Sequence, residues 1–510
     1  MRAGTMVTLV LAASLAACGS GDNPPDTEPE PPNSTDPGVI GQFGAPFDWP
    51  IISMHLALLP DGRVMSFGTS TDGRQGAQIQ YNVWDPSQGT GAASMLLLPN
   101  TTGSDISCAG QALVPATGEL LIVGGDRTVD GRRNFANSDV NLFDATSNQL
   151  TRQPQSMAYQ RWYATTVTTA DGEQIVLGGM IDRELEPPTT YAALTPEVYR
   201  AGVGWRTLTG ATSEDAFSAR NEGWYYPRAW LAPDGLIFML NHSGAMFRVN
   251  PAGRGNIEQL SSNAGPSFHT LPSVMFAPGR ILSLRSDRQS VIVDVHDDIP
   301  ALETAGMLSW DRRYANATLL ADGRVWVNGG SNTGNDLAGA AYHSEIWDPA
   351  TGRWRSAASA AKARLYHSAA LLLPDATVLT SGGGAPGPVT NLNAEIYHPP
   401  YLFLRDGSGA RAPRPQITSS PTTLRWGERF EVQMAAPGRV SRVTLVRAGA
   451  ATHAYNNDQR FLELPFTQAE SRLRMQAPML PTIAPPGFYL LFVFDAAGVP
   501  SGGQMIRLHD

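Results

Sequence analysis

The sequence predicts an all-β protein, with a seven-bladed β-propeller followed by an immunoglobulin-like β-sandwich. Glycine and proline are abundant, at 51 and 39 of 510 residues, and only 16% of residues are charged. This composition favours short strands joined by tight turns over surface helices. One turn-and-strand pattern recurs along most of the chain and then stops. The length also requires more than one domain.

The amino terminus predicts export. Arg2 precedes an apolar run, residues 6–17, that is too short to span a bilayer and typical of a signal peptide. Residues 15–19 read Leu-Ala-Ala-Cys-Gly, which resembles the lipobox of bacterial lipoproteins, in which the cysteine carries the lipid. An ordinary secretory signal with a coincidental cysteine is the alternative.

These features predict a signal peptide at residues 1–17 and a disordered tether at 18–39, which is polar and rich in proline. We expect an exported protein that is anchored by lipid at Cys18 to a bacterial outer membrane, on its periplasmic side or at the cell surface. If Cys18 carries lipid, the second cysteine, Cys108, has no partner for a disulfide.

The region from residue 40 to 405 consists of repeats. A turn followed by a short apolar strand recurs at intervals of about 44 to 63 residues, close to the period of about 50 of kelch blades. The turns are Asp61-Gly62, Thr117-Gly118, Asp171-Gly172, Asp234-Gly235, Pro278-Gly279, Asp322-Gly323 and Asp375-Ala376. Several of these strands end in Gly-Gly pairs, which permit neighbouring backbones to approach closely. Seven such units predict a kelch-type seven-bladed propeller.

The repeats stop after Tyr401. Residues 406–510 contain alternating apolar segments, such as 442–446 and 488–494, separated by proline and glycine. This pattern predicts a small immunoglobulin-like C-terminal domain. The net charge of -9 argues against a nucleic-acid surface, which would be basic.

The repeats bring chemically distinctive residues to one end of the propeller channel, because the innermost strand of every blade begins there. In four units, the position eight residues before the turn holds Tyr163, Tyr226, Tyr314 and His367. Tyr366 is adjacent to His367, and in the second unit Cys108 lies nine residues before the turn. Buried aromatic residues that cap the channel are the simpler interpretation. Phenolate and imidazole ligands suit Cu(II). His367 is the one imidazole in this set, and copper would need a second to be held firmly.

Residues 364–368 read Arg-Leu-Tyr-His-Ser and are followed by 371–375 and 382–384. These segments look like the copper-binding blade of the galactose oxidase and glyoxal oxidase family of copper-radical oxidases. Residues 449–460 are similar to its carboxy-terminal ligand loop, which enters the channel and provides the second histidine, here His453. Other segments that are similar to the family are 107–110, 161–165, 487–493 and 497–501.

The resemblance implies one copper ion with Tyr163, Tyr366, His367 and His453 as ligands, and a thioether between Cys108 and Tyr163 that forms a tyrosyl radical. It implies an oxidase in which Tyr366 takes the proton of the substrate hydroxyl, the Tyr163 radical abstracts hydrogen, and dioxygen becomes hydrogen peroxide. The expected partners are a small-molecule substrate and dioxygen, and the expected state is a monomer.

The sequence departs from galactose oxidase at the tryptophan that covers the thioether, since the corresponding position is Ile181. Trp49 is a candidate replacement. The sequence also shows no counterpart of the carbohydrate-binding domain that precedes the propeller in galactose oxidase. Both departures favour small aldehydes, as hydrates, or simple primary alcohols as substrates. The candidate substrate-binding residues are Trp162, Arg161, Tyr226 and Tyr314. The alternative for each of them is a role in packing. The alternative from another class is a non-catalytic kelch-repeat surface lipoprotein that binds a protein or glycan.

Overall fold

The structure, a computed structural model, describes residues 34–185 and 190–510. The predicted signal peptide, the lipid attachment residue Cys18 and most of the predicted tether lie outside the described residues. Within those ranges, no helix is long and apolar enough to cross a membrane. Export and lipid anchoring therefore stay predictions.

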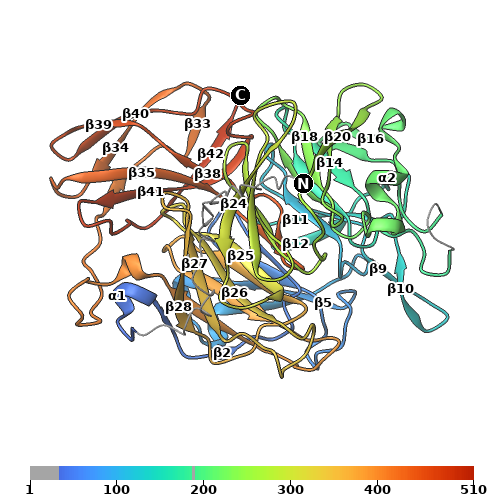
Figure 1. Cartoon of the computed structure of the whole chain (residues 1–510), viewed down its shortest axis with the longest axis horizontal. Helices are drawn as coiled ribbons and strands as arrows, with labels where there is room; N and C mark the ends of the chain where they lie inside the picture. Colours follow the sequence, from blue (N-terminus) through green and yellow to red (C-terminus); the bar gives the residue numbers. More distant parts are fainter. Residues whose placement is uncertain (1–33, 186–189) are drawn as a thin grey trace, which may run out of the picture.

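Antiparallel sheets follow one another in chain order, one for each repeat unit of the sequence (Figure 1). The first three sheets contain β3 (His55–Leu58), β4 (Val64–Phe67), β5 (Gln80–Trp84) and β6 (Met95–Pro99); β7 (Gly110–Leu113), β8 (Leu120–Val123), β11 (Val140–Asp144) and β12 (Gln149–Arg152); and β13 (Thr165–Thr168), β14 (Gln174–Leu177), β15 (Glu197–Arg200) and β16 (Gly204–Thr207). A separate hairpin, β9 (Asp126–Val129) and β10 (Arg132–Ala136), extends from the second unit, and the short helix α2 (Glu214–Phe217) follows the third.

The later units have the same arrangement. Their strands are β17 (Arg228–Leu231), β18 (Ile237–Leu240), β19 (Ala245–Asn250) and β20 (Asn256–Asn263); β21 (Ser273–Ala277), β22 (Arg280–Leu284), β23 (Gln289–Asp294) and β24 (Ala301–Met307); β25 (Arg313–Leu319), β26 (Val325–Ser331), β27 (His343–Asp348) and β28 (Arg353–Ser359); and β29 (Ser368–Leu372), β30 (Val378–Gly382) and β31 (Asn393–His398).

The strands are short because a turn ends each one, and their residues are buried because each sheet packs between two others. In β8, all of Leu-Leu-Ile-Val is buried, as expected of a continuous apolar run with sheets on both faces. Gly62, in the first repeated turn, has a φ of 87°, which only glycine adopts freely. Where the seventh unit meets the first, a Cβ on Gly382 would lie 2.8 Å from the Ser53 carbonyl oxygen, so this close approach also needs glycine.

The amino-terminal end of the described chain closes the ring. Strands β1 (Gln42–Phe43) and β2 (Phe47–Asp48) both pair with β31, the outermost of the three strands that the seventh unit supplies. The helical turn α1 (Pro37–Ile40), capped by Asp36, precedes them. The last residues of the predicted tether therefore belong to the folded domain, because their backbone is helical and Gly38 is buried.

The C-terminal region forms two packed sheets at the upper left of Figure 1. One sheet contains β32 (Ile417–Ser419), β34 (Arg429–Met434), β40 (Arg472–Gln476) and β39 (Phe466–Ala469); the other contains β33 (Thr423–Arg425), β42 (Gln504–His509), β41 (Gly487–Asp495), β35 (Val440–Arg447) and β38 (Phe461–Glu463). Apolar residues from both sheets form one core between them. The prediction of an all-β propeller followed by a sandwich is confirmed.

A hairpin from the C-terminal region joins the propeller. Its strands, β36 (Ala450–Thr452) and β37 (Tyr455–Asn456), extend the first sheet, with β36 paired to the innermost strand β3. His55 and Thr452 are direct cross-strand partners in this pairing. The hairpin thereby places the turn at His453 at the end of the channel where the innermost strands begin.

Candidate metal site

The residues at the equivalent position of five units share a rare backbone conformation. Each lies at or just before the start of an innermost strand with φ between 38° and 69°, the left-handed region that non-glycine residues seldom adopt. These residues are Cys108, Tyr163, Tyr226, Tyr314 and His367. Such a conformation costs about 1–3 kcal/mol per residue, so its recurrence indicates a functional constraint.

Hydrogen bonds between blades hold these positions in place. The Tyr163 backbone N–H donates to the Cys108 carbonyl at 2.9 Å, and the Tyr226 N–H donates to the Tyr163 carbonyl at 2.8 Å. Because the backbone turns here before the strand begins, neighbouring residues need not point to opposite faces. Tyr366 and His367 therefore both reach the site, with their rings stacked at a centroid distance of 3.8 Å.

The inserted hairpin brings His453 to the same point. Its imidazole centroid lies 4.7 Å from that of His367, with the two rings nearly perpendicular at 86°. The distances from the His453 ring to the rings of Tyr163 and Tyr366 are 4.9 and 5.7 Å. Two histidines and two tyrosines from three separate segments thus surround one location.

The donor atoms of these side chains converge. The phenol oxygens of Tyr163 and Tyr366 are 2.6 Å apart. The His453 Nε2 atom lies 3.6 Å from the Cys108 sulfur. One donor atom from each of Cys108, His367 and His453 lies within 4.8 Å of the others, and all three residues are buried.

Hydrogen bonds fix the tautomers of the two histidines. His367 Nδ1 donates to the Gly384 carbonyl at 2.9 Å, so its Nε2 is unprotonated. That Nε2 is buried without a hydrogen-bond partner among the described residues. The Thr452 hydroxyl donates to the Met54 carbonyl at 2.8 Å and therefore accepts from His453 Nδ1 at 2.6 Å. Both histidines thus direct an unprotonated Nε2 into the site, as metal-binding histidines do, and the Nε2 of His453 faces the Cys108 thiol.

Burial keeps every group of the site neutral in the protein alone. It raises the pKa of Tyr163 and Tyr366, and to a smaller extent the Cys108 thiol raises both further. Burial lowers the pKa of His367 to about 4, and it lowers the pKa of His453 well below its ordinary value. A bound cation would reverse this preference for the phenols. Two unprotonated imidazole nitrogens and two phenol oxygens are a ligand set that fits Cu(II).

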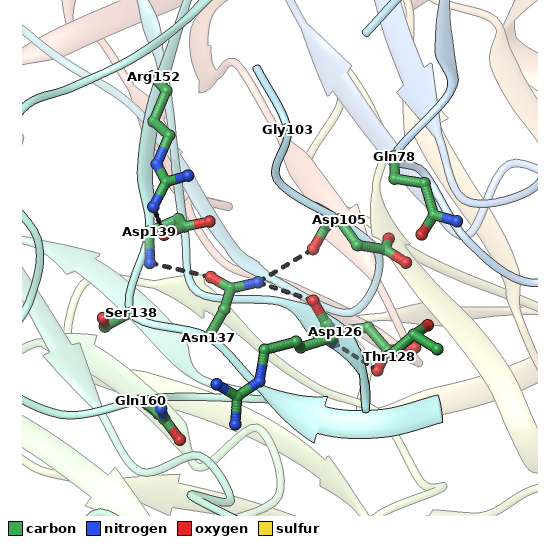
Figure 2. Close-up of a pocket in the computed structure, with 11 residues that line it drawn as sticks. Gln78, Gly103, Asp105, Asp126, Thr128, Asn137, Ser138, Asp139, Arg152 and Gln160 are labelled. Atoms are coloured by element: carbon green, nitrogen blue, oxygen red, sulfur yellow. Dashed lines mark hydrogen bonds and ion pairs between the residues drawn. The ribbon is translucent and has the colours of Figure 1, made fainter. Parts of the chain in front are cut away.

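Cys108 is presented by a firmly held loop. The Asp105 carboxylate accepts hydrogen bonds from the Ser107 N–H at 3.1 Å and the Ser107 hydroxyl at 2.8 Å. Asn137 Nδ2 donates to the carbonyls of Asp105 and Asp126 at 3.2 and 2.8 Å, and these bonds are visible in the surface pocket beside the loop (Figure 2). The buried thiol also interacts directly with the Tyr163 phenol.

Trp162 covers the Tyr163 ring, and the assignment of this role to Trp49 was wrong. The centroids of Trp162 and Tyr163 are 3.8 Å apart. Trp49 is instead buried against Trp84 at a centroid distance of 5.4 Å, and its Nε1 donates to Ser66. The residue that precedes Tyr163 thus supplies the aromatic contact that Ile181 does not.

Arg161 does not line the site, which corrects its assignment as a substrate contact. Its guanidinium is fully buried and pairs with Glu197 at 2.9 Å, and it also donates to the Gly178 and Thr195 carbonyls. Two other units contain the same pair, Arg312 with Glu345 and Arg364 with Glu395, also buried. The repetition indicates a structural role within each blade.

Replacing Arg161 with methionine is therefore expected to lower stability by about 3–5 kcal/mol, because it leaves the Glu197 carboxylate buried without its partner. Chemical denaturation measures this loss. The matched control is Arg74→Met, which removes a side chain that is 86% exposed and should change stability by less than about 1 kcal/mol. Equal stabilities of the two variants would contradict the structural role.

The two remaining candidates differ in their exposure. Tyr226 is fully buried, donates to the Ala109 carbonyl at 3.0 Å and packs against the His453 ring, so it supports the site and does not contact substrate. Tyr314 is partly exposed, and its ring lies 5.0 Å from that of Tyr366. It lines a small pocket of about 10 Å³ that also reaches Tyr366, His367 and His453.

The sequence reasoning missed three residues of this site. Tyr225 places its hydroxyl 3.5 Å from that of Tyr366, and His269 packs against Tyr225 with ring centroids 4.2 Å apart and pairs with Glu222. His55 accepts a hydrogen bond from Cys108. Counting eight residues back from the fifth turn leads to Thr270, next to His269, so the repeat itself contained the signal for that residue.

The chain is similar in sequence to known oxidases. Residues 414–508 match the family described as galactose oxidase-like, early set domain. The chain is 28% identical to a galactose oxidase of Gibberella zeae, over 92% of this chain and 71% of that protein. It is 26% identical to an aldehyde oxidase, GLOX, of Vitis pseudoreticulata, over 68% of this chain and 72% of that protein.

A solved structure has the same fold. It is a fungal alcohol oxidase of the AA5 family, in complex with copper, with a TM-score of 0.80 and 23% identity over 92% of this chain and 100% of that chain. The relatives are oxidases, which favours an enzyme over the non-catalytic alternative. The fold, the converging histidines and tyrosines and these similarities together lead to one conclusion: the chain is a copper-dependent oxidase that is similar in sequence and fold to galactose oxidase.

Proposed function

We propose that this protein oxidises a small aldehyde, as its hydrate, or a simple primary alcohol with dioxygen, and that a thioether-linked tyrosyl radical formed by Cys108 and Tyr163 takes part. The observation that carries this proposal is the unpartnered Nε2 of His367, which faces His453 and two phenols next to a buried thiol. A buried polar atom without a partner is costly unless something binds it.

The copper ion would be held by Tyr163, Tyr366, His367 and His453. When bound, copper supplies a one-electron acceptor and a place for the oxygen atom of the substrate. Gly384 and Thr452 hold the two imidazoles in the tautomer that binding requires.

Tyr366 is the group that accepts the proton of the substrate hydroxyl. It lines the pocket, and its oxygen lies 2.6 Å from that of Tyr163 and 3.5 Å from that of Tyr225. Burial raises its pKa, so a phenolate at this position is a stronger base than an exposed one.

Tyr163 is the group that removes a hydrogen atom from the substrate carbon. The thioether joins the Cys108 sulfur to the ring carbon beside the phenol oxygen and makes the ring easier to oxidise. Trp162 packs over this ring and limits the access of water to it. In each turnover the substrate loses two hydrogen atoms, which dioxygen receives as hydrogen peroxide.

The size of the pocket favours small substrates. Its volume of about 10 Å³ leaves room for a group the size of one water molecule and is far below the range of about 300–1,000 Å³ typical of pockets for drug-sized ligands. Tyr314 and His269 line its sides, so a phenol and an imidazole are available to bind polar groups of the substrate. A short aldehyde hydrate or alcohol fits this description better than a large sugar.

The cross-link is tested by mass. After copper is added in air, the intact wild-type protein is expected to lose the mass of two hydrogen atoms, and Cys108→Ser should show no such loss. Digestion should yield one linked species that contains both Cys108 and Tyr163, with no disulfide to reduce. Cys108 and Tyr163 found in separate peptides after copper loading would rule out the radical mechanism.

A further inference from the structure

His55 is a buried histidine that the proposed mechanism does not use. It lies on β3 with no exposed surface, and its Nε2 accepts the Cys108 backbone N–H at 3.0 Å. A backbone amide can only donate, so His55 Nε2 is unprotonated and the proton is on Nδ1. That Nδ1 is buried without a hydrogen-bond partner among the described residues. The polar contacts of the imidazole are therefore made through Nε2, with the Cys108 N–H and with the Thr452 hydroxyl at 3.4 Å.

The imidazole is held in a fixed orientation. Its ring stacks on Phe67 at a centroid distance of 4.3 Å and an interplanar angle of 11°. Across the β3–β36 pair, the Thr452 hydroxyl lies 3.4 Å from His55 Nε2 and 2.6 Å from His453 Nδ1. The pairing of β3 with β36 therefore places His55, which binds Cys108, beside Thr452, which binds His453.

Cys108 needs such a partner because of its backbone. Its φ of 57° is left-handed, and β7 begins only at Gly110, so its N–H lies outside the strand ladder. A buried N–H without an acceptor costs about 1–3 kcal/mol, which would favour another conformation of this residue. Asp105 fixes the preceding loop and the Tyr163 N–H binds the Cys108 carbonyl, so His55 supplies the acceptor for the Cys108 N–H.

We propose that His55 is a positioning residue that holds Cys108 in the conformation needed to form the thioether with Tyr163. The proposal rests on the proposed function. In the reaction, the S–H bond of Cys108 and a ring C–H bond of Tyr163 break and an S–C bond forms. The two electrons and two protons go to dioxygen, which becomes hydrogen peroxide, with copper present.

The test compares rates of cross-link formation. Copper is added to metal-free protein in air, and the loss of two hydrogen atoms is followed by intact mass. His55→Leu removes the acceptor, so the rate is expected to fall about tenfold, the effect of one lost hydrogen bond. In His55→Gln the amide oxygen lies near the position of Nε2, and a rate close to wild type is expected.

Two further variants separate positioning from general destabilisation. Ser66→Ala removes one buried hydrogen bond of the same sheet, to Trp49, and should leave the rate unchanged. His55→Asn keeps a polar side chain that is too short to reach Cys108, and it should cross-link as slowly as His55→Leu. The comparison of asparagine with glutamine therefore decides the question even if the leucine variant does not fold.

The outcomes for the two proposals are distinct. If wild type cross-links and His55→Asn and His55→Gln do so at the same rate, His55 does not position Cys108, while the proposed function stands. If wild type itself forms no cross-link, the proposed function is wrong. Slow cross-linking in the asparagine variant with normal copper content, and its recovery in the glutamine variant, would support the proposal.

Discussion

Replacing His453 with alanine is expected to lower the affinity for copper by more than about 100-fold. Loss of a group that only orients a metal ligand lowers metal affinity by about 10–100-fold, and loss of the ligand itself should have a larger effect. His453 is the one candidate ligand that comes from the C-terminal hairpin, and its ring centroid lies 4.7 Å from that of His367. Without it, the site has a single imidazole. Copper content after dialysis and titration calorimetry would measure the loss.

A graded series makes this result specific. Thr452→Val removes the acceptor that fixes the His453 tautomer, so copper affinity should fall by about 10–100-fold, less than in His453→Ala. The control is His296→Ala, which removes an exposed histidine paired with Asp294 and should leave copper content unchanged. Full copper occupancy in His453→Ala at equal copper concentration would exclude His453 as a ligand.

The repeat explains why much of this fold could be predicted. Each turn sets the start of an innermost strand, and equivalent positions in a propeller meet at one end of the channel. Counting back from the turns was therefore sufficient to bring Tyr163, Tyr226, Tyr314 and His367 together. The count does not reveal backbone conformation, so the left-handed φ that lets Tyr366 and His367 both reach the site was visible only in the structure.

Two incorrect assignments have a common physical cause. Distance along the chain does not give the direction of a side chain where the backbone is irregular. Arg161 lies two residues from Tyr163 but turns outward to Glu197, whereas Trp162 turns inward and covers the Tyr163 ring. Trp49 lies near the first blade in sequence, but it packs with Trp84 away from the channel.

The repeated arginines could have been recognised from the sequence. An arginine stands two residues before Tyr163 and Tyr314 and three before His367, and each of these arginines pairs with a glutamate on a later strand of its own blade. A feature that recurs in blades with different channel residues indicates structure. His55 had no such pattern, because its role depends on a contact with Cys108 in the next blade.

Replacing Tyr366 with phenylalanine is expected to lower kcat by about 10²–10⁴-fold, the contribution typical of a general base. The ring, and with it the stacking on His367, is kept, while the oxygen that accepts the substrate proton is lost. Because the three other copper ligands and Cys108 are unchanged, copper content and the cross-link should persist. Steady-state kinetics on the copper-loaded, cross-linked variant would measure the effect.

Two neighbouring phenols test whether Tyr366 is the base. Tyr314→Phe removes a hydroxyl from the same pocket without touching a candidate ligand, so it should change KM more than kcat. Tyr225 lies within 3.5 Å of Tyr366 and is the other buried phenol able to receive the proton. If Tyr225→Phe lowers kcat more than Tyr366→Phe does, the base is Tyr225. If Tyr366→Phe loses most of its turnover while it keeps copper and the thioether, and Tyr225→Phe does not, the proton leaves through Tyr366, because the two variants differ in which phenol oxygen is missing.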